Sequence, residues 1–298
     1  MLYKVYKFEF NNVHFGNNQL NESEYTFLAD TLFSALYIEA LKIGKNDEFF
    51  TKCKNGEIVF SDAFPYIRDK YYIPKPMMCI ENKDKGNSIE KKLYKKLLYI
   101  PIDELDNYLA GKMHISENPL KELGENEYRK INSVRHEEDV LPYDIGLFRF
   151  SKNCGLYILA KFLDEKTQEL FENLLEILSF YGIGGKKSIG MGKFEFKYGK
   201  MNERFLKKGG ANFMLLSSAL PKNEELENAL ENSSYLLKKR SGFIFSKTYA
   251  NEFQKKKELY VFSAGSCFKN KFEGDIYDVS KQGNHPVYRM AKAFFLEV

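Results

Sequence analysis

The sequence predicts an α+β fold made of two small mixed modules in tandem. Of the 298 residues, 44% are hydrophobic and 29% are charged, a composition that supports a buried core. Residues 28–43 and 165–180 repeat apolar side chains at helical spacing, whereas residues 2–11 alternate polar and apolar side chains as a strand does. The length fits two modules better than one.

The elements of the first module, residues 1–206, follow the order strand, helix, insertion, strand, strand, helix, strand. In chain order these elements are expected at 2–11, 28–43, 144–151, 155–163, 165–180 and 194–198. A short turn at 152–155 joins the two middle strands. This order is βαββαβ, the ferredoxin-like plan.

Residues 60–140 interrupt that order and are interpreted as an insertion outside the core. Pro65, Pro74 and Pro76 break the strand-like pieces of the first part, and residues 82–98 are rich in lysine with little apolar periodicity. A surface loop and an arm that contacts RNA or a partner remain open alternatives. On this interpretation, deleting 82–98 should leave the stability of the core almost unchanged.

The second module is expected over residues 207–298, after the linker Lys207–Gly210. It begins with an apolar strand at 212–219 and continues with a short helix near 223–232. Strands at about 233–245, 257–263 and 287–297 complete it. We interpret it as a second ferredoxin-like module.

Several classes of protein are excluded by the rarer residues. Cysteines 53, 79, 154 and 267 are too far apart for a zinc knuckle, and Val140 stands where an HExxH motif beginning at His136 needs its second histidine. The sequence therefore predicts no metal site. It contains no apolar stretch of 18 residues and begins without the apolar run of a signal peptide, so we expect a cytoplasmic protein.

The charge is unevenly distributed along the chain. Residues 1–150 carry 21 Lys and Arg against 24 Asp and Glu, a net charge of −3, and residues 151–298 carry 24 against 17, a net charge of +7. A basic second half favours an anionic ligand. A solvated, lysine-rich surface is the alternative.

The most informative motif is a glycine-rich segment, residues 182–192, which holds five of the 20 glycines. Lys186, Lys187 and Lys193 lie in or beside it. Glycine allows positive φ and close approach of a ligand, and lysines with exposed N–H groups suit phosphates. Phe180 stands where a Walker A loop needs glycine, and a dinucleotide fingerprint needs a strand before the loop, so no nucleotide cofactor is predicted. A tight connection that needs glycine only to turn is the alternative.

A helix, this motif and a strand in succession resemble the glycine-rich loop of the RAMP superfamily of CRISPR proteins. Val13–Gly16 followed by Ala29–Leu36 resembles the N-terminal signature of the fourth Csm subunit of type III-A effector complexes. The other matching segments, in that family's order, are 132–136, 263–268, 273–278 and 284–289. The resemblance thus extends from residue 13 to residue 289.

This resemblance implies a non-catalytic subunit that binds the 5′ handle of the CRISPR RNA. It implies two protein partners, the repeating backbone subunit of the Csm complex and the large, polymerase-like subunit that forms cyclic oligoadenylates. The loop residues expected at phosphates are Gly184, Gly185, Lys186, Lys187, Ser188, Gly190 and Lys193. Further expected RNA contacts are His14, Phe15, Arg135, Phe268, His285 and Arg289. Phe268 in the core, and His285 and Arg289 in a turn, remain alternatives.

The other candidate function is a metal-independent CRISPR-repeat endoribonuclease of the same superfamily. His14 or His136 would act as the general base, with Lys187 beside the leaving oxygen. Processing nucleases of this superfamily usually carry the glycine loop near the C-terminus. Here more than 100 residues follow it, so the sequence favours the subunit without catalytic residues.

Overall fold

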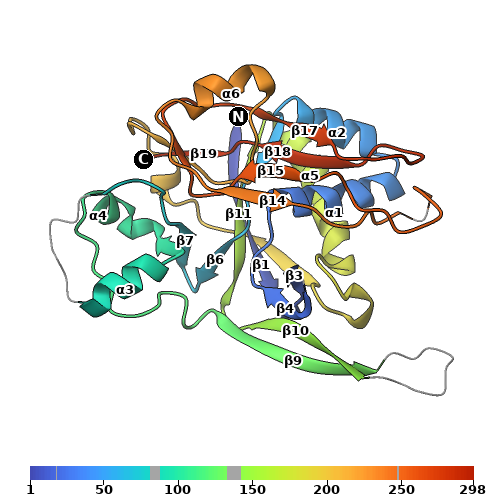
Figure 1. The fold of residues 1–298 in the computed structure, drawn as a ribbon, viewed down its shortest axis with the longest axis horizontal. Helices are drawn as coiled ribbons and strands as arrows, with labels where there is room; N and C mark the ends of the chain where they lie inside the picture. Colours follow the sequence, from blue (N-terminus) through green and yellow to red (C-terminus); the bar gives the residue numbers. More distant parts are fainter. Residues whose placement is uncertain (18, 81–87, 133–141, 247) are drawn as a thin grey trace.

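A seven-stranded antiparallel sheet forms the centre of the molecule in a computed structural model that describes all residues except 18, 81–87, 133–141 and 247 (Figure 1). Its strand order is β12, β1, β11, β6, β7 and β8, and β5 also pairs with β11. The bounds are β1 (Leu2–Phe10), β5 (Ile58–Phe60), β6 (Phe64–Ile67), β7 (Lys70–Pro74), β8 (Tyr99–Pro101), β11 (Cys154–Phe162) and β12 (Phe194–Tyr198).

Helices cover one face of this sheet. They are α1 (Ala29–Lys42), α2 (Asn46–Lys54) and α5 (Glu165–Tyr181). Tyr6 and Phe8 of β1 point to this face and join Leu36 of α1 and Phe171 of α5 in one buried cluster, as the two-residue period of a strand requires. Helix α5 begins where the Asp164 carboxylate accepts the Thr167 N–H at 2.8 Å.

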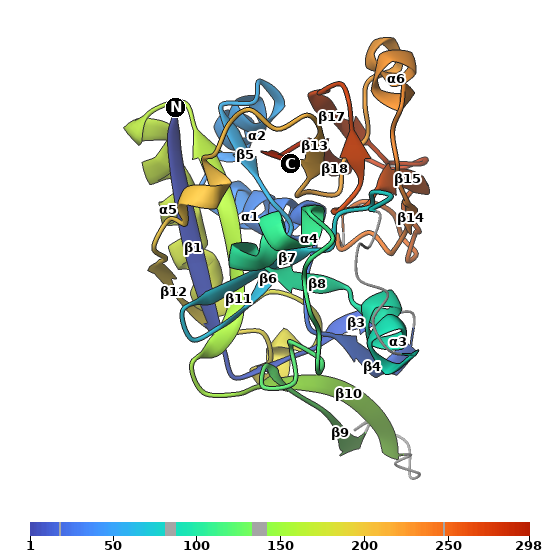
Figure 2. The ribbon, with the colours of Figure 1, turned by 90° about the vertical axis from the view of Figure 1, so that its left-hand side faces the viewer.

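The region after residue 206 contacts both sides of the helix-covered sheet. It contains α6 (Asn223–Leu230) and the strands β13 (Phe213–Leu215), β14 (Leu237–Arg240), β15 (Leu259–Phe262), β16 (Cys267–Phe268), β17 (Gly274–Asp278), β18 (Tyr288–Lys292) and β19 (Phe295–Glu297). Met290 of β18 packs in the cluster that contains α1, whereas Met214 and Leu296 pack with Leu159 on the opposite face. Figure 2 shows these strands gathered on one side of β1 and β11.

A two-stranded ribbon projects from the end of the sheet at which β1 finishes (Figures 1 and 2). It is formed by β9 (Gly124–Asn132) and β10 (Pro142–Phe150), and β2 (Asn12–Val13) pairs with the base of β10. The remaining elements are β3 (Phe15–Asn17), β4 (Gln19–Glu24), α3 (Ser88–Lys96), α4 (Leu105–Leu109) and the 3-10 turns η1 (Ile102–Glu104), η2 (Lys187–Ile189) and η3 (Glu203–Phe205).

Most of the first module lies where the sequence predicts it, but one predicted strand has different neighbours from those expected. Strands β1, β11 and β12 and helices α1 and α5 occupy the expected segments. The strand expected at 144–151 is β10, which pairs with β9 and β2 and not with β11. The strand beside β11 is β5, continued by β6. The apolar run 145–148 predicts a core strand. These residues are buried, but at the base of the ribbon and not in the central sheet.

The interpretation of 60–140 as an insertion outside the core is also wrong for much of its length. Strands β6, β7 and β8 belong to the central sheet, and Leu97, Ile100 and Tyr108 are buried. The ring of Tyr94 on α3 stacks on Tyr108 with centroids 5.7 Å apart. The many lysines of 91–96 make the apolar positions of this amphipathic helix hard to recognise in the sequence. Because the helix packs against the core, deletion of 82–98 should destabilise the core.

A second module with the βαββαβ plan is not confirmed. In the described part of residues 207–298, the strands form one three-stranded sheet and two pairs, β14 with β15 and β17 with β18. One α-helix, α6, accompanies them, where the plan requires two. The mixed α and β character that the sequence predicts does hold.

A buried ion cluster joins the start of α1 to the C-terminal strands. Arg240 donates two hydrogen bonds of 2.9 Å to the Asp30 carboxylate, and Arg289 donates a third. Asp30 and Arg289 are each only 4% exposed. Burial alone would raise the pKa of Asp30, but the two arginines outweigh it and hold the pKa below its ordinary value.

A second buried carboxylate serves as the cap that α1 lacks at its own N-terminus. Asp62 accepts the N–H of Ala29 at 2.7 Å and the N–H and hydroxyl of Ser218 at 3.0 and 2.8 Å. Burial outweighs these hydrogen bonds and raises the pKa of Asp62 to about 6. The first turn of α1 is therefore capped by Asp62, a residue distant in the sequence, whose carboxylate is held in turn by Ser218 of the C-terminal region.

We expect Asp30→Asn to lower the free energy of unfolding by about 3 kcal/mol at neutral pH, because Arg289 would keep its buried charge without a counter-charge. The depressed pKa makes this contribution available above pH 3.8, the ordinary pKa of aspartate, and it is lost as the pH falls through the lower folded value. Urea unfolding at several pH values measures both effects. The control is Glu122→Gln, whose exposed pair with Arg68 should contribute less than about 1 kcal/mol. Equal effects of the two substitutions would contradict the expectation.

Candidate nucleic-acid interface

The glycine-rich loop, residues 182–193, connects the end of α5 to the start of β12. Gly182 ends the helix with φ of +81°, and its N–H donates to the Leu178 carbonyl at 2.7 Å. The Ile183 N–H donates to the Gly192 carbonyl at 2.9 Å and closes the base of the loop. The path of the loop is therefore set by backbone hydrogen bonds.

The loop packs directly on the segment that contains His14. Gly185 donates its N–H to the His14 carbonyl, and Gly192 donates to the Asn12 carbonyl, each at 2.9 Å. A Cβ on Gly184 would lie 2.8 Å from the His14 carbonyl oxygen, and the φ of Gly184 is +98°. Glycine is needed here both for the conformation and for the close approach.

The His14 side chain ties this contact to the ribbon. Its Nδ1 lies 2.7 Å from the Gly146 carbonyl of β10, and a carbonyl only accepts, so Nδ1 carries the proton. The ring is 5% exposed and lies against Gly185. His14 thus supports the loop and does not face solvent, and the RNA contact expected of it stays a prediction.

The cations lie at the tip of the loop, Lys186 and Lys187, and at its end before β12, Lys193. Lys186 takes a left-handed conformation with φ of +56°, and its ammonium donates to the Tyr143 hydroxyl at 3.1 Å and lies 4.9 Å from the centre of that ring. Among the described residues, neither Lys187 nor Lys193 has a hydrogen-bond or ion-pair partner for its ammonium. Ser188 and Gly190 are exposed between them.

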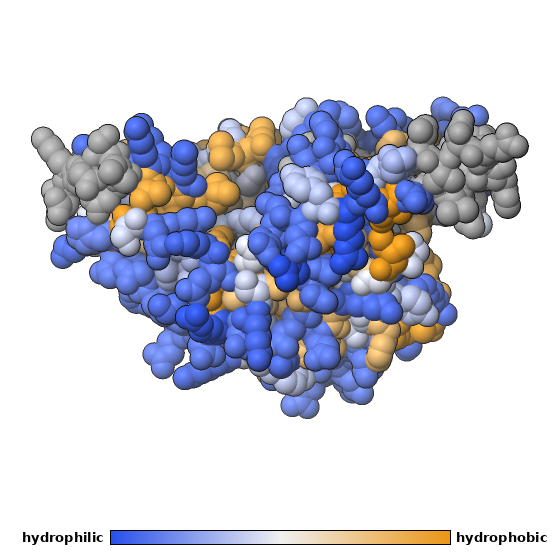
Figure 3. Space-filling view, turned by 90° about the horizontal axis from the view of Figure 1, so that it is seen from below, coloured by the Kyte–Doolittle hydropathy of each residue, from blue (hydrophilic) through white to orange (hydrophobic). Residues whose placement is uncertain are grey.

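The β9–β10 ribbon, which meets the loop through Tyr143, carries further basic and aromatic side chains. Tyr128 is 70% exposed, and Arg129 and Lys130 are exposed next to it on β9. Hydrophilic side chains dominate the face seen from this end of the molecule (Figure 3). The sequence analysis missed these residues and Tyr143, although an aromatic beside two cations in a polar strand is a signal that could have found them.

Two of the predicted stacking residues belong to the core, which corrects the sequence prediction. Phe15 is 6% exposed, and its ring meets the edges of Phe10 and Phe27. Phe268 is fully buried among other phenylalanines of the C-terminal region, including Phe262 and Phe272. Neither ring has a face free for a base.

The predicted residues near the C-terminus also have structural partners. Arg289 is held by Asp30 and donates to the Ser241 carbonyl at 3.0 Å. His285 Nε2 shares a hydrogen bond of 2.8 Å with the Ser246 hydroxyl, and the His285 ring packs against Tyr249. Neither contacts the loop. Arg135 lies outside the described residues, as does His136.

The described residues contain no group of three histidine, cysteine or acidic side chains arranged to hold a metal ion. Within the same part of the chain, no helix has the length and apolar character needed to cross a membrane. The geometry of the loop region is that of a rigid basic surface on a folded support.

Substitution of two loop glycines should separate strain from steric overlap. Gly190 has φ of +85° but open space around its Cα, so Gly190→Ala should cost roughly 1–2 kcal/mol of stability from conformation alone. Gly184→Ala adds overlap with the His14 carbonyl and should cost ~1–3 kcal/mol more. Chemical unfolding of both variants measures the difference. A Gly184→Ala protein as stable as Gly190→Ala would contradict the packing described for the loop.

Comparison with known proteins identifies relatives along the whole chain. A family model described as the CRISPR Csm4 C-terminal domain matches residues 208–298. A Csm4 protein of the CRISPR system of Streptococcus thermophilus is 35% identical over 313 residues, which cover 100% of this chain and 99% of that protein. A Csm4 protein of Mycobacterium tuberculosis strain H37Rv is 34% identical over 297 residues, with 98% and 97% covered.

Solved structures share the fold. The chain superposes on a structure of a Csm3–Csm4 subcomplex of the type III-A CRISPR-Cas interference complex with a TM-score of 0.67 and 19% identity, covering 99% of each chain. A Csm1–Csm4 cassette in complex with pppApA gives a TM-score of 0.61 and 18% identity, with 100% and 98% covered. Because the identity to curated relatives exceeds 30% over nearly the whole length, the chain belongs to the Csm4 family of type III-A CRISPR subunits, as its motifs indicate.

Proposed function

We propose that this chain is a non-catalytic RNA-binding subunit of a type III-A CRISPR interference complex and that it holds the 5′ handle of the CRISPR RNA. The observation that carries this proposal is the pair Lys187, at the tip of the loop, and Lys193, at its end before β12, which are unpaired among the described residues. A single-stranded RNA end is bound by neutralising its phosphates and by contacts to its bases. The two ammonium groups suit the first task, and the Tyr143 ring, which meets Lys186, suits the second.

The support under the loop makes this surface suitable for a fixed RNA path. Hydrogen bonds to Asn12 and His14 hold the loop backbone, so little conformational entropy is lost when RNA binds. We propose that β12, β1, β11 and β5, with α1 and α5, are the ferredoxin-like unit that the sequence predicts and that it positions this loop. The tandem arrangement would require a second unit that has diverged from the plan.

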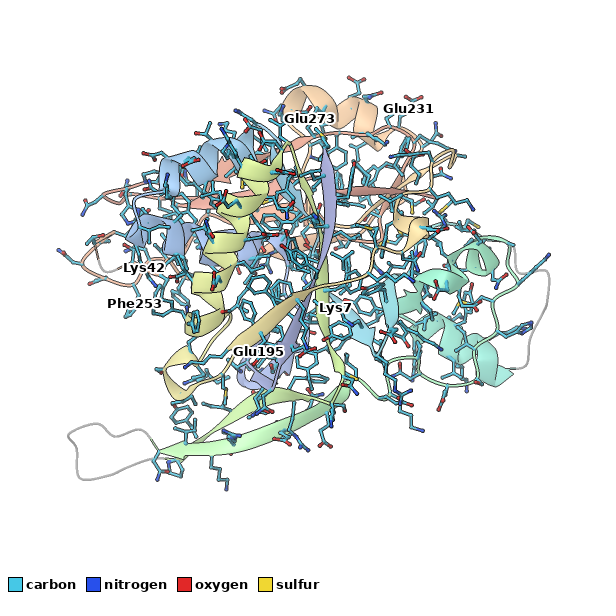
Figure 4. The ribbon with its side chains drawn as sticks, turned by 180° about the vertical axis from the view of Figure 1, so that it is seen from behind. Lys7, Lys42, Glu195, Glu231, Phe253 and Glu273 are labelled. Atoms are coloured by element: carbon cyan, nitrogen blue, oxygen red, sulfur yellow. The ribbon has the colours of Figure 1, made fainter. Side chains whose placement is uncertain are left out.

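We further propose that the chain joins a Csm3-type backbone subunit to a Csm1-type large subunit, in line with the complexes in which its structural relatives were solved. Large apolar side chains are exposed on and beside the β14–β15 pair: Tyr235, Leu236, Leu237, Phe243, Phe245, Phe253 and Tyr260. Exposed apolar groups on this scale mark protein interfaces. Figure 4 shows Phe253 at the margin of the molecule.

The environment of His14 supports a binding role over the alternative of a repeat endoribonuclease. A general base must reach the 2′-hydroxyl of the RNA. The His14 ring is buried, and its Nδ1 is engaged with the Gly146 carbonyl. No specific observation on the described residues favours cleavage.

Removing the free lysines should change the salt dependence of RNA binding. Each phosphate contact on a single strand contributes about 0.7 to the slope of log affinity against log salt, so Lys187→Ala/Lys193→Ala should reduce the slope by roughly 1.4. The measurement is a salt titration with RNA that carries the handle, in the presence of the backbone subunit. The matched control is Lys166→Ala, because Lys166 is exposed at the far end of α5, about 25 Å from the loop. An unchanged slope in the double variant would remove the loop from the RNA site.

We expect the purified chain to leave labelled CRISPR-repeat RNA intact, with Mg²⁺ or with EDTA. The reason is the buried, engaged state of the candidate base His14. Gel analysis of the RNA over several hours tests this. Cleavage that persists through purification and disappears in His14→Ala would instead support the endoribonuclease.

A further inference from the structure

A pocket lined by several lysines lies at the opposite end of β1 from the glycine-rich loop. Its volume is about 390 Å³, and it is lined by the start of β1, the end of β11 and segments of the C-terminal region. Met1 and Tyr3 line it, whereas the loop contacts residue 12, so the two sites are separated by roughly 30 Å of extended strand. Figure 4 shows Glu273, one of the lining residues, near the N-terminal end of β1.

Four lysines from different segments converge on this pocket: Lys161, Lys208, Lys271 and Lys292. Lys292 is 4% exposed, and its ammonium donates to the Lys54 and Gly274 carbonyls, each at 3.1 Å. These bonds use two of its three N–H groups. Lys161 is partly buried, and its ammonium has no hydrogen-bond or ion-pair partner among the described residues.

The acidic side chains around the pocket are already engaged elsewhere. Glu225 accepts the backbone N–H groups of Lys222, Glu273 and Gly274 at 2.8, 2.8 and 3.1 Å. Glu273 pairs with Lys222 at 3.3 Å. Glu297 is shared by Lys271 at 3.1 Å and Lys208 at 3.6 Å. Among the described residues, none of these carboxylates pairs directly with Lys161, although the charge of Glu273 acts on it.

The pKa shifts of the pocket lysines also favour an anionic ligand. Burial and then the nearby Lys292 lower the pKa of Lys161, Glu273 opposes this lowering, and Lys208 and Lys271 add smaller contributions that lower it. Burial likewise lowers the pKa of Lys292. An anion with several oxygens that enters a cluster of partly desolvated ammonium groups reduces the repulsion between them and replaces their lost hydrogen bonds to water.

Aromatic rings form the other wall. Tyr3 is 41% exposed, and its ring meets Phe294 edge to face with centroids 6.5 Å apart. Phe272 and Phe295 also line the pocket. A flat ring next to a lysine cluster matches a ligand that carries both an aromatic base and phosphates.

We propose that this pocket binds a nucleoside phosphate, with its phosphate oxygens at Lys161 and Lys292 and its base against Tyr3. The proposal is independent of RNA binding at the loop, because the two sites share no residue. It commits to a small ligand, since the pocket has the volume of a single nucleotide site.

The test is isothermal titration of the full chain with ATP, with adenosine and with pyrophosphate as separate probes. We expect saturable binding of ATP, weaker binding of pyrophosphate and no binding of adenosine. Lys161→Met should weaken ATP about tenfold through loss of one charge-assisted hydrogen bond, whereas Lys161→Arg should retain binding. Tyr3→Leu should weaken ATP and leave pyrophosphate unchanged.

Control variants keep the test decisive. Lys187→Ala in the loop and Lys166→Met on α5 should bind ATP as the unaltered chain does. If Lys161→Met does not fold, Lys208→Ala/Lys271→Ala removes two charges from the exposed rim and should also weaken ATP. Absence of saturable ATP binding, or loss of binding in Lys187→Ala, would overturn the proposal. Equal affinities for ATP and pyrophosphate, unaffected by Tyr3→Leu, would overturn the assignment of a nucleoside.

Discussion

The burial of β11 on both faces is the constraint on which the rest of the structure depends. Eight of its nine residues are buried, with Leu156 and Ile158 facing the helices and Tyr157 and Leu159 facing the opposite layer. A strand covered on both sides needs two layers around it, and residues 1–206 supply only part of the second. The C-terminal region completes that layer with Met214, which explains why the two parts of the chain share a core.

The same arrangement determines where the basic loop can lie. Helix α5 follows β11 directly and returns along the sheet to β12, so the connection between them must turn at the end where β1 finishes. The segment after β1 passes beneath that turn, and His14 and Asn12 accept hydrogen bonds from the loop there. Gly184 and Gly192 are required because backbone meets backbone there, whereas Gly190 has open space around it and is favoured by its positive φ. The lysines between these glycines are the residues available for a ligand.

The sequence predicts the elements whose apolar residues follow a regular period. It does not predict which segments become buried only because another part of the chain covers them. Helices α1 and α5 and strands β1 and β11 carry their patterns locally. Strand β5 and the segment around Leu97 become core only because β11 and the C-terminal region cover them. At the candidate site, the lysines come from the glycine-rich motif and His14 from the separate segment Val13–Gly16, and their contacts with RNA stay predictions. Motif residues can also serve packing or an ion cluster: Phe268 packs against Phe262, and Arg289 pairs with Asp30. The sequence alone does not place these partners.

The two lysine clusters lie too far apart to influence each other through solvent. The Debye length is about 8 Å at physiological ionic strength, well below the roughly 30 Å that β1 spans. Any coupling between them would have to pass through β1 and β11, whose register is held by seven successive pairs from Leu2 to Phe8. The register of this strand pair cannot shift by one residue at low cost, because such a shift would turn Tyr6 and Phe8 away from the helices. The fold therefore favours two independent anion-binding sites on one rigid sheet, and the lysines of each site set its own occupancy.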